Sequence, residues 1–176
     1  QYYLGGDLLN QIVTSSFVAR QLQIPYLGLY AACATIGEGL ALGAMIIDGG
    51  FAEKVLVGAA SHYHTAERQF RYPVELNIQH RGTNQTTVTG AGAAILANTG
   101  QGPRVTQATL GKVVDYGLKD ANDLGSAMAP AAADTLVRHF QDTGTTPGDY
   151  DLILTGDLAR MGSKMLHKLL QDADYV

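Results

Sequence analysis

Short apolar runs alternate with amphipathic segments along most of the chain. Runs of about four to eight apolar residues are typical of buried strands, and apolar residues at helical spacing are typical of amphipathic helices. This pattern predicts helices over 10–22, 34–48, 127–140 and 160–170, and strands over 25–30, 54–60, 87–97, 104–116 and 151–155. Such alternation of strands and helices is typical of an α/β layered fold.

Residues 61–86 break this pattern, because they contain few aliphatic side chains. The segment instead holds several histidines and arginines: His62, His64, His80, Arg68, Arg71 and Arg81. Long ordered excursions in compact domains are often functional. The strand predicted next, 87–97, contains Gly90 and Gly92, which favours a bulge or a close backbone approach there.

Composition excludes several classes of protein. Hydrophobic residues make up 46% of the 176 residues, too many for a disordered chain. The net charge of −4 provides no basic patch for nucleic acid. We find neither a signal peptide nor an apolar run long enough to span a membrane. The first residues, Gln1 to Tyr3, and the unterminated helical end predict a piece of a longer protein.

The single cysteine, Cys33, lies between a predicted strand and a predicted helix. One cysteine excludes an internal disulfide and fits a reducing compartment. The N–H groups at a helix N-terminus favour an anion, so a thiol there is expected to have a lowered pKa and to be nucleophilic. The alternative is a buried cysteine that acts as a small hydrophobic residue. The residues around Cys33 leave both interpretations open.

Two motifs resemble the thiolase superfamily, and most closely its ketoacyl-synthase III type. They are Ala31-Ala32-Cys33-Ala34, which resembles the nucleophile region, and TGAGAAIL at 89–96, which resembles a later glycine-containing strand. The resemblance implies a five-layered αβαβα fold with Cys33 at the mouth of a pocket, and a homodimer. It implies that 1–125 form most of the N-terminal half, incomplete at its start, and that 126–176 begin a truncated C-terminal half.

Five further motifs resemble the stage V sporulation protein AD family of endospore-forming bacteria. They are GDLLNQ at 6–11, AERQFRYP at 66–73, TVTGAG at 87–92, MAPAAAD at 128–134 and TGDL at 155–158. The resemblance implies binding of dipicolinic acid, as its calcium chelate, for uptake into the forespore. It also implies peripheral association with the inner spore membrane, together with other stage V sporulation A proteins in that membrane. No cofactor, resident metal or nucleic acid is expected.

A condensing enzyme needs more than a thiol, because histidine and asparagine groups must stabilise the developing oxyanion. In the ketoacyl-synthase III pattern a His-Gln-Ala-Asn motif follows the strand matched by 152–155. This chain has Thr155-Gly156-Asp157 there, and an ionised aspartate cannot donate a hydrogen bond. The departure favours a ligand-binding protein that is not an enzyme. The alternative is a thioester-dependent acyltransferase of the ketoacyl-synthase III type that uses Cys33.

Dipicolinate is a flat ring with two carboxylates, so its site needs cationic or N–H donors beside an apolar slot. Arginine suits carboxylates because its guanidinium binds them in a bidentate manner. The predicted ligand-binding residues are Cys33, Ala34, Arg68, Phe70, Arg71, Thr89 and Asp157.

Some of these residues also have structural interpretations. Arg68 and Arg71 are alternatively surface partners of Glu67 or Glu75, and Thr89 alternatively serves strand packing. Asp7 is either a turn or cap residue or part of the pocket. The loop at 75–86 lacks the prolines, tyrosine and tryptophan expected from the sporulation family, so its conformation is not predicted.

Overall fold

A computed structural model describes residues 1–62 and 81–175 of the chain. These residues form two compact units, one from 1–62 with 88–108 and the other from 81–87 with 109–175. The halves expected from the resemblance, 1–125 and 126–176, remain a prediction, because compactness alone does not delimit the halves of a duplicated fold.

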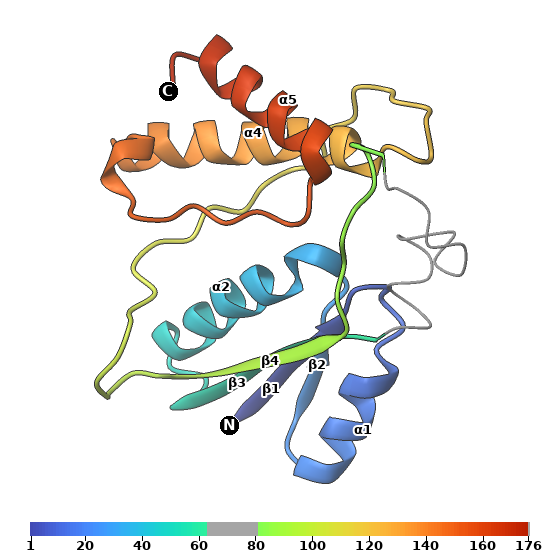
Figure 1. The fold of residues 1–176 in the computed structure, drawn as a ribbon. Coiled ribbons are helices and arrows are strands. Elements are labelled where there is room, and N and C mark those ends of the chain that lie inside the picture. The colour runs from blue at the N-terminus through green and yellow to red at the C-terminus, as the bar shows by residue number, and fades with distance from the viewer. Residues whose placement is uncertain (63–80, 176) are drawn as a thin grey trace. The chain divides into compact units, whose positions relative to one another are not determined.

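The first unit is built on a four-stranded sheet in the order β2-β1-β3-β4 (Figure 1). Its strands are β1 (Tyr2–Asp7), β2 (Tyr26–Gly28), β3 (Lys54–Ser61) and β4 (Gly90–Ala97). Strand β1 is parallel to β2 and β3, whereas β4 is antiparallel to β3. The predicted α/β class is therefore confirmed.

Helices connect the parallel strands of this sheet. Helix α1 (Val13–Leu22) joins β1 to β2, and the short 3-10 helix η1 (Ala32–Ala34) with α2 (Thr35–Asp48) joins β2 to β3. Figure 1 shows α1 and α2 on opposite faces of the sheet. The predicted strand–helix–strand crossover around Cys33 is therefore present.

The core of the first unit lies between α2 and the sheet. Leu4, Val55 and Val57 are fully buried there. Gly39 and Gly43 face the strands, because a Cβ atom on Gly39 would collide with Val57 and one on Gly43 with Leu96. Small residues therefore let α2 approach the sheet closely.

Strand β1 was not among the predicted strands. Its sequence, YYLGGD, includes two glycines and no β-branched residue, so its strand propensity is weak. Nevertheless five of its six residues are buried. Pairing on both sides, with β2 and with β3, stabilises this strand.

The bulge predicted at Gly90 and Gly92 is wrong. Strand β4 pairs with β3 in an unbroken register, with Gly90 opposite Ser61 and Gly92 opposite Ala59. Nothing in the described part of the chain lies within 4 Å of a Cβ atom built on either glycine. Regular pairing, rather than a bulge, therefore accommodates them.

Two predicted strands, 104–116 and 151–155, are also wrong, because neither is assigned to a sheet. Their apolar side chains are exposed, with Val113 95% and Leu154 81% accessible. A strand needs a partner for its backbone hydrogen bonds. No strand among residues 1–62 and 81–175 pairs with these segments. Their apolar pattern alone is therefore not enough to make them strands.

The second unit consists mainly of two helices packed together, α4 (Leu124–Thr143) and α5 (Ala159–Asp172), with the short 3-10 helix η3 (Pro147–Asp149) between them. Its core contains Ala129, Ala133, Leu158 and Leu166.

Helix α4 begins three residues earlier than the sequence pattern predicts. The Asp123 carboxylate caps it by accepting a hydrogen bond from the Ser126 N–H at 3.1 Å. Pro130 therefore lies inside the helix rather than in its first turn, and it provides no N–H for the Ser126 carbonyl. None of the helices in the described residues is long and apolar enough to cross a membrane.

Candidate functional site

The carboxyl ends of the parallel strands form one edge of the sheet, the place where ligands bind in open α/β folds. Cys33 follows β2 at this edge, beyond the end of that strand. Thr89 directly precedes β4, whose first residue pairs with the last residue of β3, so Thr89 lies at the same edge. The first unit therefore places three predicted ligand-binding residues at one edge of the sheet: Cys33 and Ala34 after the outer strand β2, and Thr89 before the other outer strand β4.

Cys33 occupies the middle of η1, two residues before α2 begins. We call residues 31–34 the cysteine corner. Within it Cys33 is half-buried and Ala34 is exposed, so the corner faces the surface of the unit. Ala32 has a φ of 46°, in the left-handed region that alanine rarely adopts. The corner that carries the cysteine is therefore a strained backbone segment.

A polar loop after β1 supports this corner. One oxygen of the Asp7 carboxylate, Oδ1, accepts hydrogen bonds from the N–H groups of Leu9 and Gln11 at 3.2 and 3.1 Å. Asn10, between them, accepts a hydrogen bond from the Ala32 N–H through its side-chain oxygen at 3.1 Å. Asp7 therefore acts as a turn residue, one of the two interpretations that its position allows.

Asn10 was not among the predicted site residues. Its φ of 57° is left-handed, a conformation that asparagine tolerates in turns. The turn was therefore detectable, but its contact with Ala32, which is 22 positions away, was not.

Two buried oxygens beside the corner have no hydrogen-bond partner among residues 1–62 and 81–175. They are Oδ2 of Asp7, in a residue 3% exposed, and Oγ1 of Thr35, in a residue 1% exposed. Buried polar atoms of this kind are uncommon in folded proteins and call for a specific explanation. Asp7 directly precedes the loop that contacts Ala32, and Thr35 is the first residue of α2.

Three further predicted ligand-binding residues, Arg68, Phe70 and Arg71, lie outside the described residues. His62, at the end of β3, is the described residue nearest to them in the sequence. Its Nε2 lies 3.3 Å from the Thr14 hydroxyl of α1. A polar contact therefore follows the carboxyl end of β3, at the same edge of the sheet as Cys33.

Asp157, the remaining predicted residue, belongs to the second unit. Its Oδ2 accepts hydrogen bonds from the backbone N–H and the hydroxyl of Thr86, and its Oδ1 accepts from the Ala159 N–H at 2.9 Å. Both carboxylate oxygens therefore have protein donors. Through these hydrogen bonds, the carboxylate connects the loop before β4 with the start of α5.

The same loop closes over the N-terminus of α5. The Gly82 carbonyl accepts hydrogen bonds from the N–H groups of Arg160 and Met161 at 3.0 and 3.1 Å. Gln85, 4% exposed, donates from its side-chain amide to the Asp157 carbonyl. The Gly82 carbonyl satisfies two helix N–H groups that would otherwise lack an acceptor. Residues 82–86 therefore have a defined conformation, which the divergent sequence did not predict.

We expect the variant Asp157→Ala to lower the free energy of unfolding by about 2 kcal/mol, because it removes charge-assisted bonds to a loop and a helix start. Asp157→Asn keeps one carbonyl acceptor and should lose about half as much. Urea unfolding of both variants measures the difference. Equal stability of the wild type and Asp157→Ala would contradict the proposed anchoring role.

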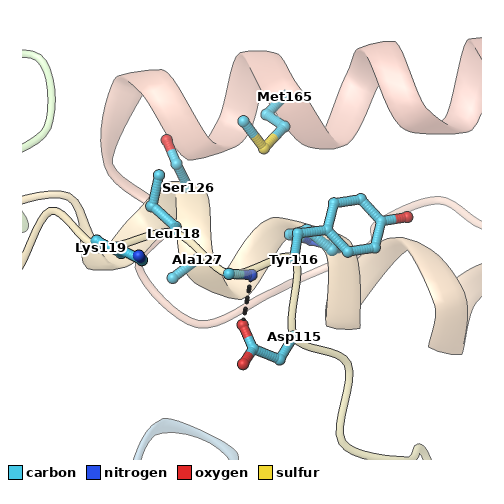
Figure 2. A pocket seen from close by; sticks show the side chains of 9 residues that line it. Asp115, Tyr116, Leu118, Lys119, Ser126, Ala127 and Met165 are labelled. Atoms are coloured by element: carbon cyan, nitrogen blue, oxygen red, sulfur yellow. Dashed lines mark hydrogen bonds between the residues drawn. The ribbon is translucent and has the colours of Figure 1, made fainter.

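The second unit also contains a pocket of about 370 Å³ (Figure 2). Apolar side chains such as Leu118, Pro130 and Met165 line it, and Lys119 is the one cation among the described residues that line it. Asp115 already accepts a hydrogen bond from the Gly117 N–H at 2.7 Å. None of the residues that line the pocket is among the predicted ligand-binding residues.

The fold of the chain is thiolase-like, because it matches solved condensing enzymes of that fold along nearly its whole length. Solved structures with this fold match 97% of the chain. They include a tetronic acid condensing enzyme, with 19% identity, a TM-score of 0.60 and 60% of that chain covered. Another is 3-oxoacyl-(acyl carrier protein) synthase III from Pseudomonas aeruginosa PAO1, with 14% identity, a TM-score of 0.64 and 58% covered.

Within this fold class, the chain belongs to the stage V sporulation protein AD family, whose model matches residues 1–176. The stage V sporulation protein AD of Bacillus subtilis (strain 168) is 51% identical over 172 residues, which are 98% of this chain. The chain spans about half of that relative, 51% of its length. The predicted family and fold are therefore confirmed.

Proposed function

We propose that the protein binds dipicolinic acid, as its calcium chelate, during uptake of this compound into the forespore, and that it does not catalyse acyl transfer. Membership of the sporulation family supports the biological setting. The observation that carries the non-catalytic assignment is the state of Asp157. Both of its carboxylate oxygens accept hydrogen bonds from the protein.

The chemistry of Asp157 argues against a condensing enzyme. An oxyanion must be stabilised by hydrogen-bond donors. A carboxylate that accepts from the Thr86 and Ala159 N–H groups is an acceptor, and its negative charge repels an oxyanion. The chain therefore keeps the cysteine corner of the condensing-enzyme fold but lacks a donor at this position.

The proposed site combines the cysteine corner with the arginines of 66–73. Cys33, Ala34 and Thr89 supply a small-residue edge of the sheet, and Arg68 and Arg71 supply the cations for two carboxylates. Phe70 supplies an apolar ring contact. In this proposal the protein is a homodimer that associates peripherally with the inner spore membrane, together with other stage V sporulation A proteins.

Calorimetric titration of the full-length protein with dipicolinate, with and without calcium, tests the proposal. We expect saturable binding below millimolar ligand. No heat of binding at millimolar concentrations would overturn it. Incubation with an acyl-CoA tests the alternative, because a condensing enzyme would gain an acyl mass that the variant Cys33→Ala does not gain. We expect no such gain in the wild type.

The arginines give a second prediction. Arg68→Ala and Arg71→Ala should each raise the dissociation constant for dipicolinate about tenfold or more, since a charge-assisted hydrogen bond contributes roughly 1.5–3 kcal/mol. Arg104→Ala is the matched control, because Arg104 is exposed in the first unit and outside the predicted site. If all three variants bound dipicolinate equally well, the arginines would have no part in the site.

A further inference from the structure

We propose that Asn10 is a positioning residue that holds the backbone of Ala32, and with it Cys33, in the conformation that the ligand site requires. The inference rests on the proposed function only in naming the site. The geometry that carries it belongs to the first unit alone.

The backbone of Ala32 is strained. Its φ of 46° lies in the left-handed region, where the Cβ atom of an L-residue crowds the backbone. Such a conformation costs about 1–2 kcal/mol and persists only where neighbouring structure stabilises it. Ala32 directly precedes Cys33, so relaxation of its φ would turn the cysteine and the start of α2.

A hydrogen bond from outside η1 opposes this relaxation. Asn10 Oδ1 accepts a hydrogen bond from the Ala32 N–H at 3.1 Å. The neighbouring Ala34 N–H bonds locally to the Ala31 carbonyl at 2.8 Å, which closes the turn but leaves φ of Ala32 to be stabilised from outside. The Ala32 carbonyl accepts locally from the Thr35 N–H at the start of α2, whereas Asn10 joins Ala32 to the loop after β1.

Asn10 is itself held in a hydrogen-bonded loop. Asp7 accepts hydrogen bonds from the N–H groups of Leu9 and Gln11, and the Asn10 N–H donates to the Asp7 carbonyl at 3.1 Å. This loop begins at the carboxyl end of β1, a strand paired on both sides. Asn10 is therefore held by the sheet and transmits its position to the cysteine corner.

Two buried oxygens beside Ala32 and Cys33 are consistent with a polar ligand group there. Oδ2 of Asp7 and Oγ1 of Thr35, in residues 3% and 1% exposed, have no hydrogen-bond partner in the part of the chain that the structure describes. Burial of such oxygens without a partner is unfavourable and calls for a specific explanation, which a polar group of the proposed ligand would supply. They stand on the two elements that Asn10 connects.

Alkylation of Cys33 by iodoacetamide in the full-length protein, followed on the Cys33 peptide by mass spectrometry, tests the inference. Asn10→Ala should raise the alkylation rate at least threefold, because the relaxed corner exposes a half-buried sulfur. Asn10→Asp keeps the Oδ1 acceptor and should stay within twofold of the wild type. Asn98→Ala, at an exposed asparagine on the turn after β4, is the control and should leave the rate unchanged.

Repeating the comparison in a protein that also carries Ala32→Gly separates a positioning role of Asn10 from a general loss of stability. Glycine adopts a positive φ without strain, so Ala32→Gly should reduce the effect of Asn10→Ala to less than half. An unchanged rate in Asn10→Ala, equal effects of Asn10→Ala and Asn10→Asp, or the same effect with Gly at position 32 would each overturn the inference. Because alkylation needs no dipicolinate, these outcomes stay separate from failure of the proposed ligand.

Discussion

Replacement of Gly162 by alanine is expected to destabilise the second unit by about 3 kcal/mol. A Cβ atom on Gly162 would overlap the backbone of Gly125, and one on Gly125 would overlap the Leu158 carbonyl. The two helices therefore touch through backbone atoms, which cannot rotate away as a flexible side chain does. Separation of the helices would open the core around Ala129 and Leu166.

Urea unfolding of the full-length protein, followed by far-ultraviolet circular dichroism, measures this effect as a lower transition midpoint at unchanged slope. Gly125→Ala should behave like Gly162→Ala. Gly37→Ala is the matched control, because Gly37 is exposed in α2 and nothing described lies within 4 Å of its Cβ position. That control should be neutral or stabilising by up to about 1 kcal/mol. A midpoint for Gly162→Ala equal to that of the wild type would mean that the helices do not cross at these glycines.

The helices were predictable because their apolar residues recur with a period that is visible within one segment. Helices α1, α2, α4 and α5 begin within three residues of the predicted starts. Their capping residues shift the ends only slightly, as Asp123 does for α4. Local periodicity therefore carries most of the information about these elements.

Strands were predicted less well, because a strand depends on partners that lie far away in the sequence. Strand β1 forms despite Gly5 and Gly6, since β2 and β3 pair with it on both sides. By contrast, 104–116 and 151–155 have apolar patterns without a described partner. Propensity alone ranks these segments in the wrong order.

In the candidate site, too, local features were predictable from the sequence and long-range contacts were not. Cys33 was predictable because it is the single cysteine and follows a short apolar run. The support from Asn10 was not, since the contact spans 22 positions. Asp157 was recognised as a departure from the condensing enzymes. Its contact with Thr86 spans 71 positions, so no local sequence pattern could predict it. Residue types were therefore visible in the sequence, and their partners were not.

Gly6→Ala is expected to have the largest effect in the first unit, with a loss of about 2–3 kcal/mol of stability. A Cβ atom on Gly6 would lie 2.5 Å from the Leu29 carbonyl oxygen and 2.9 Å from the Thr35 methyl group. Leu29 and Thr35 lie on either side of the cysteine corner, so the alanine would push that corner away from β1. The alkylation rate of Cys33 should therefore change together with the midpoint of urea unfolding.

Gly92→Ala is the control that isolates this cause. Gly6 and Gly92 both pair with Ala59, one from each neighbouring strand, so they occupy the same row of the sheet. Nothing described lies within 4 Å of a Cβ atom on Gly92, and a strand tolerates alanine better than glycine. Gly92→Ala should therefore leave both stability and Cys33 alkylation close to the wild type. If Gly6→Ala were equally harmless, the close approach of β1 to the corner would not exist, and the hydrogen bond from Ala32 to Asn10 would have to hold the corner without it.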